Sequence, residues 1–83
     1  MDTFYIYVLY SVIHDQIYIG QTNDLAARLK RHNAGRVKST NRYIPWKLIY
    51  SETFKTRSAA MNREQELKSH FGRDWIRRNL IHK

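Results

Sequence analysis

The segments Phe4–Tyr10, which read FYIYVLY, and Gln16–Gln21, which read QIYIGQ, decide the fold. β-Branched and aromatic residues dominate the first segment. In the second segment Ile occupies alternate positions, with the period of two that is typical of a strand. His14-Asp15 lies between them and suits a tight turn. The two segments are therefore expected to form an antiparallel hairpin.

The chain after the hairpin carries helical and extended patterns in turn. The first expected helix runs from Leu25 to about Asn33, with a cap at Thr22 or Asn23, with Leu25, Ala26 and Leu29 facing inward, and with a stop at Gly35. A basic loop over residues 36–46 and a strand over Trp46–Phe54 follow. The chain is then expected to form a helix over Thr56–His70, ended by Phe71-Gly72, and a short helix over Arg73–Ile81. The order is β-β-α-β-α-α. It predicts an α/β (α+β) fold in which helices flank one three-stranded, mainly antiparallel sheet.

Composition limits the class of protein. The 83 residues are expected to form a single domain, residues 1–83, because 42% are apolar and 27% charged, as in folded globular chains. No apolar run approaches the about 18 residues that a membrane span needs, and no secretory signal pattern is visible, so a cytoplasmic protein without a membrane partner is expected. The chain has no cysteine, which excludes disulfide scaffolds, cysteine-ligated metal centres and cysteine nucleophiles.

Charge points to a polyanionic partner. Fifteen Lys and Arg residues against seven Asp and Glu give a net charge of +8, and residues 25–51 contain no acidic side chain. Such a field attracts nucleic acid. The candidate contacts in this stretch are Arg31, Arg36, Lys38 and Arg42. The alternative is a basic surface that only keeps a small protein in solution.

Several polar residues fall on helix faces that the pattern turns inward. Glu64 shares the stripe of Ala60, Leu67 and Phe71, so it is either paired with an inward Arg or a metal ligand. Arg28 and His32 lie one turn apart beside the apolar stripe of the first helix. They can bind phosphate and move a proton, or they can extend to water from the edge of the stripe.

The same features recur in the last helix and in the sheet. Asn79 follows Trp75 by one turn and is expected to face inward. Tyr7 and Tyr18 can lie on one side of the sheet, either for packing alone or as part of a site. Gly20 near a strand end indicates the close approach of a ligand or of another backbone.

These residues together resemble the GIY-YIG endonuclease family. The two tripeptides Tyr5-Ile6-Tyr7 and Tyr18-Ile19-Gly20, the Arg28-x3-His32 helix and a Glu on the next long helix carry the resemblance, which runs from about residue 4 to residue 80. The chain departs from the family pattern at Tyr5, where the family name has Gly. It also departs at Gln21, where some relatives carry Lys, so another cation would have to supply that charge.

The resemblance implies a catalytic site. Its residues would be Tyr7, Tyr18, Arg28, His32, Glu64 and Asn79. Glu64 would be the one protein ligand of a single divalent cation, Mg²⁺ or Mn²⁺, which stabilises charge on the scissile phosphate and on the leaving 3′ oxygen. One of the two tyrosines would activate the attacking water, with Tyr7 preferred, and Gly20 would allow the strand end to pack closely on the site.

The resulting hypothesis is a divalent-metal-dependent endonuclease that hydrolyses DNA phosphodiester bonds, in repair or recombination. Its partner would be duplex or branched DNA, and a homodimer is one way for a single small site to cut both strands. Two alternatives remain open at this stage. One is a nucleic-acid-binding module that retains the nuclease fold without turnover, and the other is a polyanion- or protein-interaction domain.

Overall fold

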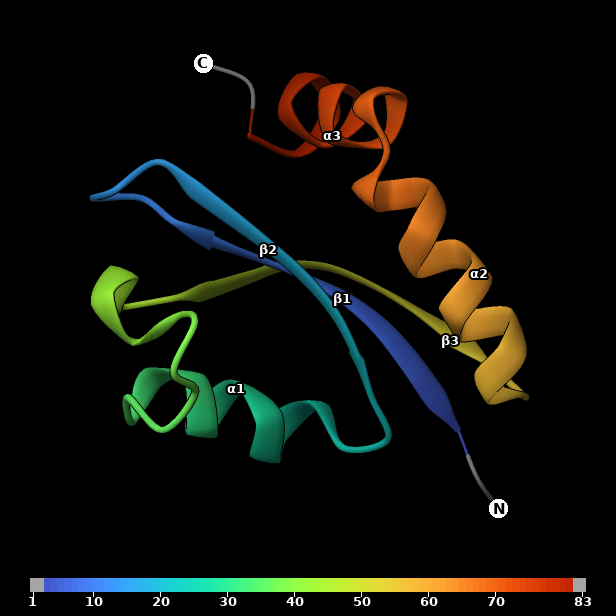
Figure 1. Cartoon of the computed structure of the whole chain (residues 1–83), viewed down its shortest axis with the longest axis horizontal. Coiled ribbons are helices and arrows are strands. Elements are labelled where there is room, and N and C mark those ends of the chain that lie inside the picture. Colours follow the sequence, from blue (N-terminus) through green and yellow to red (C-terminus); the bar gives the residue numbers. More distant parts are fainter. Residues whose placement is uncertain (1–2, 82–83) are drawn as a thin grey trace.

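The computed structural model describes residues 3–81 and confirms the predicted α+β architecture (Figure 1). The elements are β1 (Phe4–Ser11), β2 (Gln16–Thr22), α1 (Leu25–Asn33), the 3₁₀ turn η1 (Asn41–Tyr43), β3 (Lys47–Phe54), α2 (Arg57–Lys68), α3 (His70–Ile76) and the π-helical turn η2 (Arg77–Ile81). None of the helices in this part of the chain has both the length and the apolar character that a membrane crossing requires.

The sheet has the strand order β2-β1-β3, and both pairings are antiparallel. The hairpin turn ends at Asp15, whose φ of 51° lies in the left-handed region that Asp tolerates in turns. The register places Tyr7 opposite Gly20 and Val8 opposite Ile19. Because the side-chain period of a strand is two, this register sends Tyr7 and Gly20 to one face and Val8 and Ile19 to the other.

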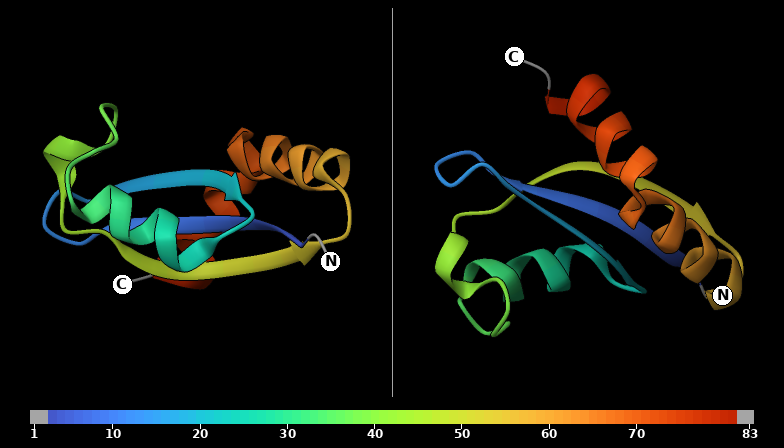
Figure 2. Two further views of the ribbon diagram at one scale, coloured as in Figure 1. Left: turned by 90° about the horizontal axis from the view of Figure 1, so that it is seen from below. Right: turned by 45° about the horizontal axis from the view of Figure 1, so that its top comes forward.

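Each face of the sheet carries its own small core. Ile6 and Val8 on β1 are fully buried beneath α2 and α3, which contribute Ala60, Leu67 and Ile76. The opposite face buries Tyr7, Leu9 and Trp46 with the partly buried Leu25 and Leu29 of α1. Figure 2 shows from two further sides that α1 and the loop after it lie together, away from α2 and α3.

The ends of α1 differ slightly from expectation. Asp24 caps the helix by accepting a hydrogen bond from the Ala27 N–H, whereas Thr22 accepts from the Asp24 N–H in the turn before it. Ala26 is exposed, not inward. The predicted stop at Gly35 is confirmed, because this residue has a φ of 77° that other residues adopt only at a cost.

The C-terminal helices differ more from the prediction. α2 ends at Lys68, and Ser69 then caps α3 by accepting from the Gly72 N–H, so the third helix begins at His70 rather than at Arg73. Phe71 was predicted to extend the buried stripe of the second helix. It is 84% exposed because it belongs to a new helix with a different direction.

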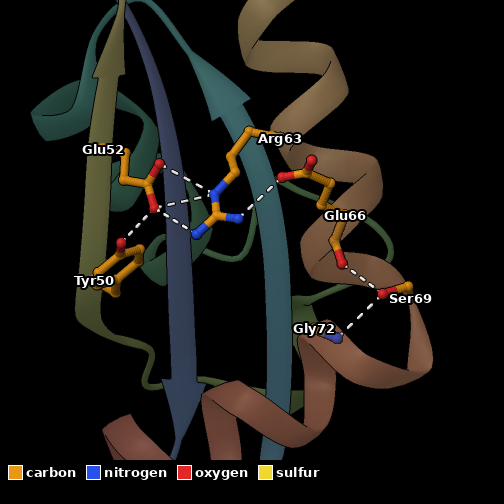
Figure 3. Close-up of polar contacts among 6 residues, drawn as sticks. All are labelled: Tyr50, Glu52, Arg63, Glu66, Ser69 and Gly72. Carbon is orange, nitrogen blue, oxygen red and sulfur yellow. Dashed lines mark hydrogen bonds and ion pairs between the residues drawn. The ribbon is translucent and has the colours of Figure 1, made fainter.

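Polar contacts fix α2 against β3 (Figure 3). Arg63 on α2 donates to both carboxylate oxygens of Glu52 on β3, at 2.9 to 3.1 Å, and also to Glu66 one turn along its own helix. The Tyr50 hydroxyl donates to the same Glu52 carboxylate. With Arg63 held toward β3, the next residue, Glu64, is directed toward the β2 side of the helix.

Candidate active site

Three rings from three elements meet on the α1 face of the sheet. Tyr7 comes from β1, Tyr18 from β2 and His32 from the last turn of α1. The Tyr7 and Tyr18 ring centroids are 6.1 Å apart, and His32 lies 6.0 Å from the first ring and 4.9 Å from the second. Tyr7 and His32 are both essentially without solvent exposure. The prediction that the two tyrosines share one side of the sheet is confirmed.

Tyr7 and His32 are joined by a buried hydrogen bond of 3.1 Å between the phenol oxygen and Nε2. Burial is the main reason that the pKa of Tyr7 is raised well above its usual range, and the neighbouring Tyr18 raises it further. Burial also lowers the pKa of His32. The pair is therefore neutral near pH 7, with a proton donor and a proton acceptor at hydrogen-bonding distance.

Arg28 is the cation of this cluster. It is half-buried one turn before His32 on α1, and its charge favours ionisation of Tyr7 and lowers the pKa of His32. The alternative in which both polar residues of this helix extend to water is wrong for His32, which has no exposed surface. A partly desolvated guanidinium beside two neutral proton-transfer groups is suited to holding a phosphate.

Gly20 leaves the space that the Tyr7 ring occupies. A Cβ at this position would lie 2.6 Å from the hydroxyl oxygen of Tyr7 and 2.8 Å from Cζ of the same residue. It would also lie 3.0 Å from Cε2 of Tyr18. Ordinary van der Waals contacts are longer than 3.4 Å. The close approach at Gly20 is therefore made by a side chain, the Tyr7 hydroxyl across the β1–β2 pair, and not by the other backbone that was one of the two expected causes.

Glu64 approaches the cluster from α2, on the other face of the sheet from α1, and both of its carboxylate oxygens are partnered. Oε1 accepts from the Gln21 amide at 3.2 Å, and Oε2 pairs with Lys68 at 2.8 Å. The side chain is 16% exposed, and its charge contributes to the raised pKa of Tyr7. The inward direction of Glu64 is confirmed, but its ion-pair partner is a Lys of its own helix instead of an inward Arg.

The donor set near Glu64 fits a hydrated divalent cation. Mg²⁺ is commonly held by one or two carboxylates, with water and substrate phosphate oxygens completing its shell. The buried Oε1 of Gln21 has no hydrogen-bond partner, so a further oxygen lies beside this carboxylate. Within residues 3–81 no cluster of three or more His, Asp or Glu side chains could enclose a metal ion. Glu64 therefore fits Mg²⁺ or Mn²⁺ with most of its water retained.

A basic strip extends from this cluster along α1. Arg28 and Arg31 line a small groove with the β2–α1 turn, and Arg31 and Arg36 line a second shallow groove farther along the helix. Lys38 and Arg42 are exposed in the following loop but line neither groove. Arg28, Arg31 and Arg36 thus line two adjoining grooves that share Arg31, and we call these three residues the α1 strip.

Asn79 is not brought to the cluster, and its predicted inward orientation is wrong. It is exposed in η2, where its side-chain amide donates to the Trp75 carbonyl oxygen at 2.9 Å. The reason is the π-helical turn, whose i→i+5 bonding shifts residues away from the angular positions of an α-helix.

Two residues near the site were not identified from the sequence. Thr40 lies 2.8 Å from Nδ1 of His32, and the Gln21 amide donates to Glu64. Thr40 lies in a loop without periodicity, so no local pattern relates it to His32. Gln21 had a signal, because it directly follows Gly20 on the strand that carries Tyr18, but it was interpreted only as the loss of a cation.

An antiparallel sheet that presents two tyrosines, a histidine and an arginine beside a carboxylate from the next long helix defines the class of this domain. Residues 3–79 match the GIY-YIG catalytic domain, and the chain belongs to the GIY-YIG family, whose members are generally endonucleases. The family resemblance seen in the sequence is confirmed.

The chain is similar to small proteins of one branch of this family. A UPF0213 protein of Haloquadratum walsbyi is 40% identical over 70 residues, which cover 83% of this chain and 78% of that protein. A UPF0213 protein of Staphylococcus aureus is 34% identical over 71 residues, covering 84% and 85%. The solution NMR structure of a UPF0213 protein from Bacillus halodurans matches with a TM-score of 0.54 and 28% identity, covering 89% of this chain and 81% of that chain.

Proposed function

We propose that the protein is a divalent-cation-dependent endonuclease that hydrolyses phosphodiester bonds of DNA. The observation that carries the proposal is the buried hydrogen bond between Tyr7 and His32 beside the Arg28 guanidinium. Burying two polar, proton-carrying groups is costly, and an apolar pair would fill the same space without that cost. A site for moving a proton near a phosphate accounts for this arrangement.

The proton path follows from the neutral state of the pair. A neutral phenol can take a proton from water only if it passes its own proton on, and His32 Nε2 is 3.1 Å from the Tyr7 oxygen. The attacking water gives its proton to the Tyr7 oxygen, the phenolic proton moves to His32 Nε2, and the hydroxide forms a bond to phosphorus as the leaving oxygen departs. Tyr7 thus needs no ionised ground state, despite its raised pKa.

The other residues position the substrate. Arg28 binds a non-bridging phosphate oxygen, Tyr18 borders the water position from β2, and the rest of the α1 strip follows the nucleic-acid backbone. Glu64 would hold the cation, which, when bound, neutralises charge on the phosphate and on the leaving oxygen. The α1 strip carries charge suited to contacting a phosphate backbone, which fits an enzyme that acts on DNA in repair or recombination. The cytoplasm remains the proposed compartment.

One observation favours a second candidate, a nucleic-acid-binding module without turnover. Both oxygens of Glu64 have partners, so a cation has to displace Lys68 or compete with Gln21. Such a module would bind DNA through the α1 strip and show no metal-dependent cleavage.

Nicking of supercoiled plasmid in Mg²⁺ or Mn²⁺, beside an EDTA control, separates the two candidates. The variant Glu64→Ala should lose cleavage and keep DNA binding. Glu66→Ala is the matched control, because it removes the same charge from the same helix at a side chain that is 66% exposed. Cleavage that persists in a clean Glu64→Ala preparation would refute the ligand assignment. DNA binding without cleavage by the unaltered protein, on plasmid and on branched DNA, would establish the binding module instead.

A further inference from the structure

Thr40 makes the second polar contact of the His32 ring. His32 is fully buried, and each ring nitrogen has one partner: Nε2 lies 3.1 Å from the Tyr7 hydroxyl and Nδ1 lies 2.8 Å from the Thr40 hydroxyl. Thr40 itself is 1% exposed. A neutral imidazole carries one proton, so these two contacts must have opposite directions.

Counting donors and acceptors decides which nitrogen carries that proton. The Thr40 hydroxyl also lies 3.3 Å from the Val37 carbonyl oxygen, which can only accept. If the Thr40 proton points to Val37, the hydroxyl oxygen accepts from Nδ1–H and Nε2 accepts from Tyr7. Every hydrogen in this chain of bonds then has an acceptor.

The opposite arrangement leaves a buried donor without a partner. If Thr40 donated to Nδ1, then Nε2–H would donate to the Tyr7 oxygen, and the Tyr7 proton would need another acceptor. The nearby Arg28 offers only donors, and within residues 3–81 His32 is the one acceptor side chain that lies at hydrogen-bonding distance from the Tyr7 hydroxyl. Since an unpaired buried O–H is strongly disfavoured, the first arrangement dominates.

We infer that Thr40 is a positioning residue: its hydroxyl holds His32 in the Nδ1–H tautomer and so keeps the Nε2 lone pair directed at the Tyr7 hydroxyl. In catalytic terms the inference rests on the proposed function, because it explains why Tyr7 can deliver its proton to His32. The tautomer itself does not depend on any activity and can be measured separately.

The backbone around Thr40 is fixed without its hydroxyl. The Trp46 indole N–H donates to the Thr40 carbonyl oxygen at 3.0 Å, and the Thr40 N–H donates to Val37. The substitution Thr40→Val keeps the shape and both of these bonds but removes the acceptor of Nδ1–H. Each tautomer of His32 then leaves one buried donor unpaired, Nδ1–H in one and the Tyr7 O–H in the other, so the Nδ1–H tautomer should lose its preference and the Nε2–H tautomer, which blocks the transfer, should become populated. Thr40→Ser retains a hydroxyl and is the matched control.

The test is the ¹⁵N chemical shift of each His32 ring nitrogen, recorded by long-range ¹H–¹⁵N correlation near pH 7, with the His32 signals identified as those missing in His32→Gln. The unaltered protein and Thr40→Ser should show a protonated Nδ1 and an unprotonated Nε2, and Thr40→Val should show both ring nitrogens shifted to intermediate values, as in a mixture of the two tautomers. In plasmid nicking, Thr40→Val should lower kcat in proportion to the fraction of His32 that leaves the Nδ1–H tautomer, with KM nearly unchanged. Thr40→Ser should recover most of the rate.

A protonated Nε2 in the unaltered protein would overturn the inference without any variant being made. An unchanged tautomer in a folded Thr40→Val protein would also overturn it. If the unaltered protein has the Nδ1–H tautomer but cleaves nothing, the proposed function fails and the role of Thr40 in fixing the tautomer stands. Normal cleavage by a protein whose His32 has the Nε2–H tautomer would refute the role of Thr40 and leave the proposed nuclease function standing.

Discussion

The substitution Gly20→Ala tests whether the position of the Tyr7 hydroxyl matters for cleavage. The new Cβ would lie 2.6 Å from that oxygen. To reach a normal contact of about 3.4 Å the hydroxyl must move by about 0.8 Å. The bond from Tyr7 to His32 is 3.1 Å long, so a shift of this size is large enough to disrupt its hydrogen-bonding geometry. Displacing a reacting group by about 1 Å typically costs about 100-fold in rate.

The effect on stability should be small by comparison. Overpacking a core costs about 1–3 kcal/mol, and replacing Gly by Ala within a strand returns about 0.5–1 kcal/mol. The net loss is therefore about 0–2.5 kcal/mol, which leaves the protein folded at 25 °C if its total stability is ordinary.

Initial rates of plasmid nicking for four proteins provide the assay: the unaltered chain, Gly20→Ala, Tyr7→Phe and the double variant. We expect Gly20→Ala to be about 100-fold slower, with an unchanged near-UV circular dichroism spectrum. The double variant should be no slower than Tyr7→Phe, because both changes disable the same proton transfer. A folded Gly20→Ala protein that nicks DNA at the normal rate would refute the reasoning, as would fully multiplicative losses in the double variant.

Three further predictions concern charge. Replacing Arg36 and Lys38 together by Ala should weaken DNA binding and reduce the slope of log K against log salt by about 0.9 for each phosphate that is no longer neutralised, measured by fluorescence anisotropy. Lys68→Met should lower the Mg²⁺ concentration for half-maximal nicking by about 2- to 5-fold, because it removes the cation that competes for the site carboxylate. Glu52→Gln should destabilise the protein by about 1–2 kcal/mol at pH 7 and by much less at pH 3, as followed by thermal unfolding. Burial is the largest single influence and raises the pKa of Glu52, but the hydrogen bonds from Arg63 and Tyr50 and the charge of Arg63 together lower it by more. The stabilisation is therefore present above the unfolded-state pKa and is lost as pH falls through the folded one.

Each of these predictions has its own control and opposing outcome. For DNA binding, the control is the double variant Lys55→Ala, Arg78→Ala, which removes the same charge from another part of the surface. If this control weakens DNA affinity as much as the Arg36 and Lys38 substitutions do, binding depends only on the net charge of the protein. For the metal, a higher requirement in Lys68→Met would assign Lys68 to the substrate phosphate. For stability, Glu66→Gln serves as the exposed comparison, and an unfolding difference for Glu52→Gln that is constant from pH 7 to pH 3 would contradict the ion-pair account.

The half of the fold that bears most of the site is predictable from local pattern. The alternation along the hairpin fixes which residues share a face, so Tyr7 and Tyr18 could be placed together from the sequence alone. Helical spacing put Arg28 and His32 one turn apart beside the apolar stripe of α1, although it left open whether they extend to water. These inferences need only neighbouring residues, and the structure confirms the placements, while the catalytic roles remain predictions.

The remaining errors arise where the chain changes direction or where contacts are distant. The helical spacing of apolar residues continues through Ser69, so Phe71 was assigned to a buried stripe that ends before it. Ser69 is a good N-cap residue, and it was the signal for a new helix. Thr40 could not be assigned to His32, because the path of the loop depends on contacts with Trp46, which lies beyond it.

That loop is closed at its base by one side chain. The Asn33 amide donates to the Trp46 carbonyl oxygen at 2.9 Å and accepts from the Trp46 N–H at 2.6 Å, so the two ends of residues 34–45 are held together. A segment whose ends are already fixed has less conformational entropy to lose when a partner orders it. The backbone that carries the positive charges of this loop is therefore ordered before any polyanion binds, and little of the free energy of binding a nucleic acid would be lost in ordering it.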